Sequence, residues 1–151
     1  MPSPVRLNLQ APSRGWMDVV LTVGETRLEF SASYIPSDSV RDLAEAVSGL
    51  LRGVKDQTVS WNTEPIRYEF RFTTTGQHIR LEVYQFADHR QSGGVAVAAV
   101  VEETRVLCLA LWRTLRRLQG QLSEAAYATA WQHPFPSEVV RRITSQLDLA
   151  G

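Results

Sequence analysis

The chain has one cysteine, no net charge and no apolar run long enough to cross a membrane. Its 151 residues include 16 basic and 16 acidic side chains, which gives a formal net charge of +0. Such a balance provides no long-range field that would attract nucleic acid or an anionic membrane. The most apolar run, VAVAAVV at 95–101, is far shorter than the roughly 20 residues that a membrane-spanning helix needs. We therefore expect no nucleic acid and no membrane as a partner.

The lone cysteine, Cys108, excludes a disulfide within the chain. It lies in the apolar run VLCLALW, where a thiol usually behaves as a small buried hydrophobic group. The first residues, MPSPVRLNLQ, lack the basic and then apolar layout of a secretory signal. We expect a cytoplasmic protein in which Cys108 has a structural role.

Motifs for chemistry are also missing. The glycines form neither GxGxxG nor GxxxxGK[ST], and no GxSxG is present. His78, His89 and His133 lack the spacing typical of metal ligands. Asp88, His89 and Ser92 are residue types of catalytic relays, but neighbours along a strand point to opposite faces, so a polar loop is favoured. The sequence predicts no catalytic residue, no metal site and no cofactor.

The first half of the chain predicts strands followed by a helix. Alternating apolar residues indicate a short strand at 5–9 and a hairpin over 16–34 that turns at Gly24 and Glu25. Apolar residues then recur at helical spacing over 38–52, after candidate capping residues and before a glycine. This amphipathic helix needs a sheet against which to pack.

The runs IRYEFRF and QHIRLEVYQF predict a second hairpin. A four-residue loop over 73–76 would place Glu69 opposite Arg80 and would place Arg67 opposite Glu82. A turn centred one residue later would oppose like charges, which is unfavourable. We therefore expect the four-residue loop.

The rest of the chain predicts one apolar strand and then helices. The run GVAVAAVV is expected to be a central strand, and residues 102–149 are expected to form two or three helices. Strands, helix, strands and helices in this order predict an α+β class: one antiparallel sheet of six or seven strands with the C-terminal helices packed on one face. We expect a single domain over 1–151, strand-rich over 1–101.

A polar and aromatic corner interrupts the second group of strands. Trp61 and Glu64 are candidate partner-binding residues, because tryptophan offers contact area and a donor while glutamate offers charge. The alternative is that Asn-Thr-Glu-Pro forms a turn and Trp61 closes the core. Pro65 should hold Glu64 in an extended conformation at the strand entrance.

A basic stripe is the second candidate surface. Arg113, Arg116 and Arg117 lie within about 120° of Arg105 on a helical wheel, if the run is one helix. Such a stripe could bind an acidic protein, which a neutral chain favours over nucleic acid. The alternative is a solvated face of an amphipathic helix.

The segment SYIPSDSVRDLAEAVSGLLRG after a hairpin, followed by WNTEPIRYEFRF, resembles small bacterial α+β domains, some of which are suspected to be immunity-like or interaction proteins. The resemblance covers about residues 16–101 and carries no established chemistry. It implies a bacterial protein with an immunity-like or interaction role and identifies no catalytic residue.

The leading functional hypothesis is a protein-binding or immunity-like accessory protein. The alternative is a small-molecule binder or enzyme with a pocket between sheet and helices, lined by aromatic residues such as Tyr68, Tyr84 and Trp112. A homodimer formed through the apolar helix or an edge strand is a third hypothesis.

Overall fold

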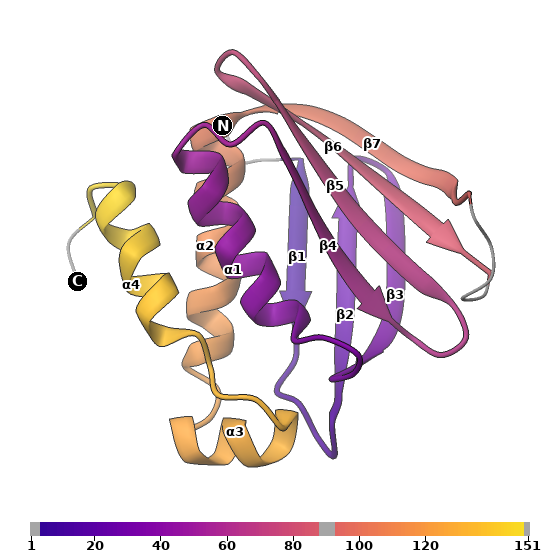
Figure 1. The fold of residues 1–151 in the computed structure, drawn as a ribbon, viewed down its shortest axis with the longest axis vertical. Coiled ribbons are helices and arrows are strands. Elements are labelled where there is room, and N and C mark those ends of the chain that lie inside the picture. Colours follow the sequence, from indigo (N-terminus) through magenta and orange to yellow (C-terminus); the bar gives the residue numbers. More distant parts are fainter. Residues whose placement is uncertain (1–3, 88–92, 150–151) are drawn as a thin grey trace.

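The computed structural model describes residues 4–87 and 93–149, which form one seven-stranded antiparallel sheet and four helices (Figure 1). The strands are β1 (Val5–Leu9), β2 (Trp16–Val23), β3 (Thr26–Ser33), β4 (Asp56–Asn62), β5 (Arg67–Thr75), β6 (His78–Phe86) and β7 (Val95–Glu103). The helices are α1 (Ser39–Leu51), α2 (Thr104–Gln119), α3 (Glu124–Trp131) and α4 (Ser137–Gln146). The predicted α+β class is confirmed, with strands adjacent in chain order.

The first hairpin forms as predicted. Val23 pairs with Thr26, so Gly24 and Glu25 form a two-residue turn, and Gly24 has the positive φ that such turns require. Alternate residues of β2 face the core and are buried: Met17, Val19, Leu21 and Val23. The period-two pattern therefore fixed both the strand and its buried face.

The sheet bends sharply between β3 and β4. The two strands share a single pair, Ser33 with Asn62, and α1 lies between them in the chain. β4–β7 consequently cross in front of β1–β3 (Figure 1), and β7 reaches β2. Where the two groups of strands separate, the ring of Phe30 stacks on Tyr68 with centroids 4.4 Å apart. The core lies between these two groups and the helices.

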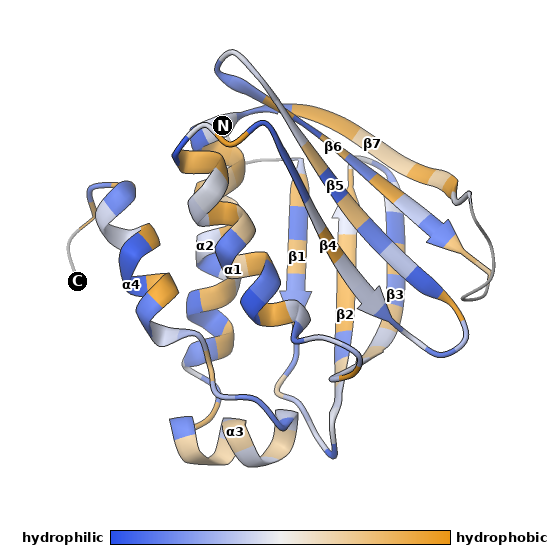
Figure 2. Ribbon diagram, viewed as in Figure 1, coloured by the Kyte–Doolittle hydropathy of each residue, from blue (hydrophilic) through white to orange (hydrophobic). Residues whose placement is uncertain are grey.

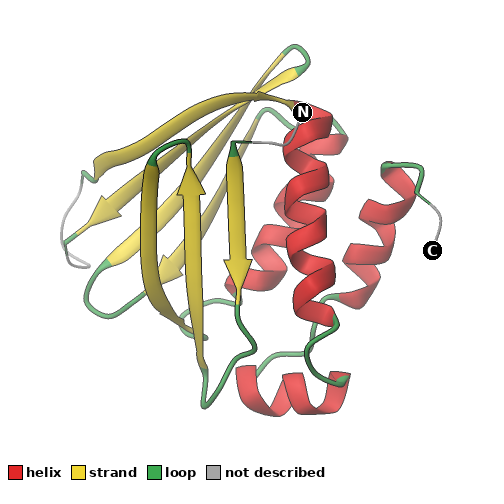
Figure 3. Cartoon of the chain, turned by 180° about the vertical axis from the view of Figure 1, so that it is seen from behind, coloured by secondary structure: helices red, strands yellow, loops and turns green. Residues whose placement is uncertain are grey.

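The helices gather on one side of the sheet (Figure 3). The predicted helix at 38–52 is α1, whose apolar stripe is buried against β4, α2 and α4, while polar residues occupy its other face (Figure 2). Asp38 is the N-cap, because its Oδ1 accepts from the backbone N of Arg41 at 3.2 Å. Gly53 follows the helix with a φ of 82°.

The boundary between strands and helices differs slightly from the prediction. β7 continues to Glu103, and α2 begins at Thr104 without a loop. Ser123 caps α3, accepting from Ala126 N at 3.1 Å. Ser137, by contrast, is the first residue of α4, and its hydroxyl donates to Glu124 at 2.7 Å.

The predicted loop of the β5–β6 hairpin is wrong. Thr75 pairs with His78, so the turn contains two residues, Gly76 and Gln77. Gly76 has a φ of 61°, the left-handed conformation that a two-residue turn demands at its first position. The shorter turn adds residue pairs to both strands.

The register predicted from charge pairing was wrong because the salt bridges join residues of the same strand rather than residues of the two paired strands. Glu69 lies 3.0 Å from Arg71 and 3.3 Å from Arg67, both on its own strand. Arg71 is opposite Glu82 across the hairpin, so like charges are still avoided. The rule on charges excluded one register, but it did not select the correct one.

The position predicted for the apolar strand is also wrong. β7 is the last strand of the sheet and has β6 as its one neighbour among the described strands. Val95 and Val101 expose 61% and 56% of their surface. A run of valine and alanine fits either location, and β7 lies at the edge because the chain enters α2 directly instead of adding another strand.

Candidate functional site

The candidate site is built where α2 packs along β1. Four leucines of α2 are buried against the core: Leu107, Leu111, Leu115 and Leu118. On the flank of this stripe, the hydroxyl of Thr114 donates to the carbonyl oxygen of Leu7 at 2.7 Å. Just beyond the end of α2, Gln121 accepts from Ala11 N at 2.8 Å and donates to Leu9 O at 3.2 Å. The outer edge of β1 is thereby bound by side chains of the α2 segment.

This packing brings Arg6 of β1 next to Arg113 and Arg117 of α2. The three arginines are exposed and line one hollow of about 230 Å³. The rest of its lining is Val5, Leu7, Asn8, Ala110 and Thr114, so it contains no carboxylate. The Nη2 atom of Arg117 lies 3.5 Å from both Leu7 O and Thr114 Oγ1, at the floor of the hollow. We name Arg6, Arg113 and Arg117 the β1–α2 cationic cluster.

The cluster is distinguished by three arginines that line one hollow without a carboxylate, since Arg14, Arg52, Arg105 and Arg141 also form no ion pair with a described carboxylate but lie elsewhere. Six arginines lie within 4.0 Å of a carboxylate oxygen: Arg27, Arg41, Arg67, Arg71, Arg80 and Arg142. Arg6, Arg113 and Arg117 have no such partner among the described residues. Their charges are therefore not neutralised locally, although the whole chain is neutral.

Arg116 does not belong to this cluster. Its guanidinium lies 5.5 Å from the centroid of the Trp112 ring, and with Arg141 and Glu124 it lines a different hollow between α2, α3 and α4. Arg105 is separate again, because it donates to the carbonyl oxygen of Leu147 at 2.7 Å. The single basic stripe expected from the helical wheel is thus divided among three environments by the elements that pack beside α2.

The sequence prediction missed Arg6 because 107 residues separate it from Arg113. The alternation of VRLNL does place Arg6 and Asn8 on the exposed face of β1, opposite the buried valine and leucines. Nothing in that pattern says which helix lies alongside. The packing of α2 against β1 supplies this information.

Trp61 is not available as a contact residue. It is 0% exposed, and its ring packs against Phe70 and Phe30 with centroid distances of 5.5 and 6.2 Å. The prediction that Trp61 binds a partner is therefore replaced by its core role, because a recognition residue must be accessible.

Glu64 is exposed, but its backbone is not extended as predicted. Its φ is 46°, and the Glu64–Pro65 peptide bond is cis. The Oδ1 atom of Asn62 accepts from Glu64 N at 3.2 Å, while Asn62 Nδ2 donates to Ile35 O at 2.9 Å. Side-chain hydrogen bonds from Asn62 therefore shape this corner as a turn.

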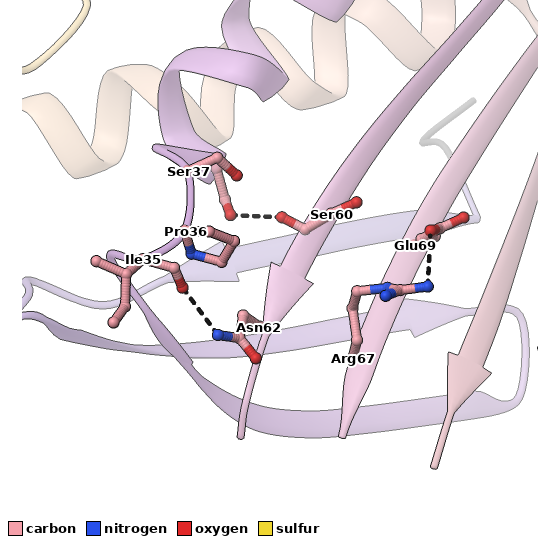
Figure 4. Close-up of a pocket in the computed structure, with 8 residues that line it drawn as sticks. Ile35, Pro36, Ser37, Ser60, Asn62, Arg67 and Glu69 are labelled. Carbon is pink, nitrogen blue, oxygen red and sulfur yellow. Dashed lines mark hydrogen bonds and ion pairs between the residues drawn. The ribbon is translucent and has the colours of Figure 1, made fainter. Parts of the chain in front are cut away.

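A second hollow lies beside that corner (Figure 4). It has a volume of about 320 Å³. One side is formed by the β3–α1 loop and the start of α1, with Ile35, Pro36, Ser37 and Ser39. The other side is formed by residues of β4 and β5 that face away from the core: Ser60, Asn62, Arg67 and Glu69. The hydroxyl of Ser39 donates to Ser60 O at 2.5 Å. Arg67 is paired with Glu69, yet its Nε atom is buried and has no hydrogen-bond partner. The charged residues that line this hollow, Arg67 and Glu69, form an ion pair, so it has no net charge.

The aromatic residues expected to line a common pocket lie in three places. Tyr68 faces the core side of the sheet, where it stacks on Phe30. Tyr84 faces the opposite side, 4.1 Å below the guanidinium of Arg71. Trp112 donates to Thr144 Oγ1 at 2.9 Å, between α2 and α4. The predicted Tyr68, Tyr84 and Trp112 pocket is therefore wrong.

The described residues offer little for covalent or metal chemistry. Burial raises the pKa of the Cys108 thiol to about 12, so it is protonated at neutral pH. Burial, and secondarily the charge of Asp38, also raise the pKa of Tyr127. Within 4–87 and 93–149, no group of three histidine, cysteine or acidic side chains could hold a metal ion. The polar residues Asp88, His89 and Ser92 lie outside the described part of the chain.

None of the helices in the described segments is long and apolar enough to cross a membrane. Comparisons of the chain with protein-family models, with curated proteins and with solved structures found no match.

Proposed function

We propose that this domain is a non-enzymatic accessory protein, of the immunity-like kind, that binds an acidic protein through the β1–α2 cationic cluster. One observation carries the proposal: Arg6, Arg113 and Arg117 line a single hollow that contains no carboxylate, whereas six other arginines are ion-paired. Cations that line one hollow without a carboxylate form a positively charged surface, which is complementary to a negatively charged group of a partner.

The geometry favours a carboxylate of the partner as the group that enters the hollow. Guanidinium groups bind carboxylates through two parallel hydrogen bonds. Arg113 and Arg117 are four residues apart on α2, so they project from the same side of the helix. Arg6 approaches from β1, so a carboxylate would meet cations from two directions. An exposed cluster of this kind chiefly accelerates association and selects the partner by charge.

Three baits test this proposal: the wild-type chain, Arg113→Glu and Lys55→Glu, each used for affinity capture from cells of its source. Both substitutions change the charge by the same amount at exposed positions, but Lys55 lies outside the cluster. The partner should be retained by the wild-type chain and by Lys55→Glu. It should be lost with Arg113→Glu and at salt near 0.5 M, where charge interactions are screened within a few ångströms.

The captured species decides between partner classes. A stoichiometric acidic protein that depends on Arg113 supports the proposal. Capture that is sensitive to nuclease, or a protein retained equally by all three baits, overturns it. Purified partner should then show an association rate that falls with added salt for the wild-type chain and depends much less on salt for Arg113→Glu.

A small-molecule binder is the second candidate function, and the hollow of Figure 4 favours it. Its volume of about 320 Å³ is at the lower limit for ligand pockets. The buried Nε atom of Arg67 lacks a hydrogen-bond partner, which an acceptor on a small polar ligand could supply. A metabolite that raises the melting temperature of the wild-type chain, and not that of Arg67→Met, would support this function.

A further inference from the structure

The outer edge of β7 is an open pairing surface. Over 95–101 the strand contains only valine and alanine, without the charges or proline that usually protect an edge. The backbone groups of this segment make no hydrogen bond outside the β6–β7 ladder with any described residue. Val101 is 56% exposed, and Ala99 beside it is exposed as well.

The opposite edge of the sheet shows how this protein protects a strand. Along β1, Thr114 binds the carbonyl of Leu7, and Gln121 binds the carbonyl of Leu9 at 3.2 Å. At the C-terminal end of β7, the Glu102 carboxylate accepts from Glu103 N at 3.0 Å. The backbone of β7 before Glu102 makes no comparable hydrogen bond to a side chain among the described residues. Exposed amides and carbonyls flanked by small apolar side chains form a template for another strand.

A β-bulge limits where a second strand can pair. Val83 pairs with Ala98 and Tyr84 pairs with Ala96, so Val97 is the extra residue. Regular pairing is therefore expected from Ala98 onward.

We infer that two copies of the chain associate through antiparallel pairing of their β7 strands, centred on Val100. This inference does not depend on the proposed function, because no residue of 95–103 lines the cationic hollow. In this register Val101 of one copy lies opposite Ala99 of the other. Both side chains are on the outer face, since their β6 partners are Arg80 and Glu82. The exposed valine is thus covered by the shortest apolar side chain.

The charges of β7 favour this arrangement over parallel pairing. Its acidic residues, Glu102 and Glu103, are both at the C-terminal end. Antiparallel pairing places them opposite Ala98 and Val97 of the other copy. Parallel pairing in register would place each glutamate opposite itself, which is unfavourable. A single pair of edge strands forms a small interface, so the dimer should dissociate in the micromolar range.

Sedimentation equilibrium of the full chain at several micromolar concentrations tests the inference, using Ala99→Lys and Val54→Lys. In the monomer the new lysine at 99 would lie opposite Glu82, so the β6–β7 ladder is preserved. In the dimer two such lysines lie near the two-fold axis and repel. Val54 is also exposed but lies in the loop after α1. The wild-type chain and Val54→Lys should dimerise, and Ala99→Lys should be monomeric with unchanged near-ultraviolet circular dichroism.

Two further variants keep the inference testable if Ala99→Lys fails to fold. Val101→Thr preserves the β-branched shape and should weaken dimerisation roughly tenfold, because two buried methyl groups are lost per dimer. Val100→Cys should form a disulfide between copies under mild oxidation, because antiparallel partners on a two-fold axis are within disulfide reach. The native thiol of Cys108 is 0% exposed and does not compete.

The outcomes are distinct. A wild-type chain that is monomeric at every concentration overturns the inference, as do unchanged dimerisation of Val101→Thr or equal cross-linking of Val100→Cys and a Val54→Cys control. Assemblies larger than two copies also overturn it, because pairing of one edge with its own copy leaves no further β7 edge open.

Discussion

Thr114 on α2 donates a hydrogen bond to the carbonyl oxygen of Leu7 on β1 at 2.7 Å, across 107 residues of chain. The bond does two things at once. It is the shorter of two hydrogen bonds to this edge carbonyl, the other coming from Arg117 Nη2 at 3.5 Å, and it holds α2 in the position where Arg113 and Arg117 meet Arg6. The stability of the fold and the shape of the candidate site therefore depend on the same contact.

Replacing Thr114 by valine should destabilise the protein by about 1 to 3 kcal/mol. Valine keeps the shape of threonine but leaves the buried Leu7 carbonyl with only the long hydrogen bond from Arg117 Nη2 at 3.5 Å. Urea unfolding followed by circular dichroism measures the change, with Thr114→Ser as the control that retains the hydroxyl. If the serine variant lost as much stability as the valine variant, the hydrogen bond would not be the cause.

Neutralising one arginine of the β1–α2 cationic cluster should stabilise the free protein slightly. Arg113→Gln removes repulsion among three cations that have no described carboxylate partner, which should contribute a few tenths of a kcal/mol at low salt. The gain should disappear at high salt. Lys55→Gln is the matched control, because Lys55 is next to Asp56 and outside the cluster. Thermal unfolding at two salt concentrations measures the change in stability. If Arg113→Gln and Lys55→Gln changed the stability equally, repulsion within the cluster would not be the cause.

Asp38 connects α1 to α3, and its loss should be costly. Its Oδ1 accepts from Arg41 N at 3.2 Å and from the indole of the fully buried Trp131 at 2.9 Å. Asp38→Ala should therefore cost about 2 to 4 kcal/mol, combining a lost N-cap with an unpaired buried donor. Asp38→Asn keeps an acceptor and should lose less. Equal unfolding midpoints for the two variants in urea would contradict this assignment.

Alkaline pH should destabilise the wild-type protein through Cys108. Burial raises the pKa of this thiol from an ordinary value of 9.0 to about 12. A raised pKa favours the protonated form in the folded state, so its contribution is complete below the unfolded pKa and declines as pH rises above it. The loss should be about 1 kcal/mol between about pH 9 and about pH 10, before Tyr127 begins to contribute in the same direction.

The control for this titration is Cys108→Ala. That variant starts from a lower stability because a buried side chain is truncated, so the slope with pH is the decisive quantity. A slope equal to that of the wild-type chain over this interval would exclude Cys108 as its source.

Most of the secondary structure could be predicted from the spacing of apolar residues, because that spacing is visible within the roughly ten residues of a single strand or helix. The alternation in β2 predicted both the hairpin and its buried face, and the spacing in α1 predicted a helix whose bounds differ by one residue at each end. The β5–β6 register was missed because Arg67, Glu69 and Arg71 pair along one strand, which no cross-strand rule anticipates.

The candidate site was only partly predictable. Arg113 and Arg117 were found from the helical pattern, whereas Arg6 lies beside them because the N-terminal strand β1 packs against α2. The sequence left two roles open for Trp61, because an aromatic residue beside a polar turn has the same sequence signature whether it faces the core or a partner, and its burial selects the core. Burial depends on what packs above a residue, which local sequence does not state.

The sequence by itself determined the α+β class, the extent of most elements, and the absence of recognised motifs for chemistry, because these depend on residue types and their local spacing. The tertiary structure decided the rest. It placed β7 at an edge, divided the arginines of α2 among separate environments, and assembled Arg6 with Arg113 and Arg117. These features depend on which surfaces pack together, and packing is set by the whole chain rather than by any segment of it.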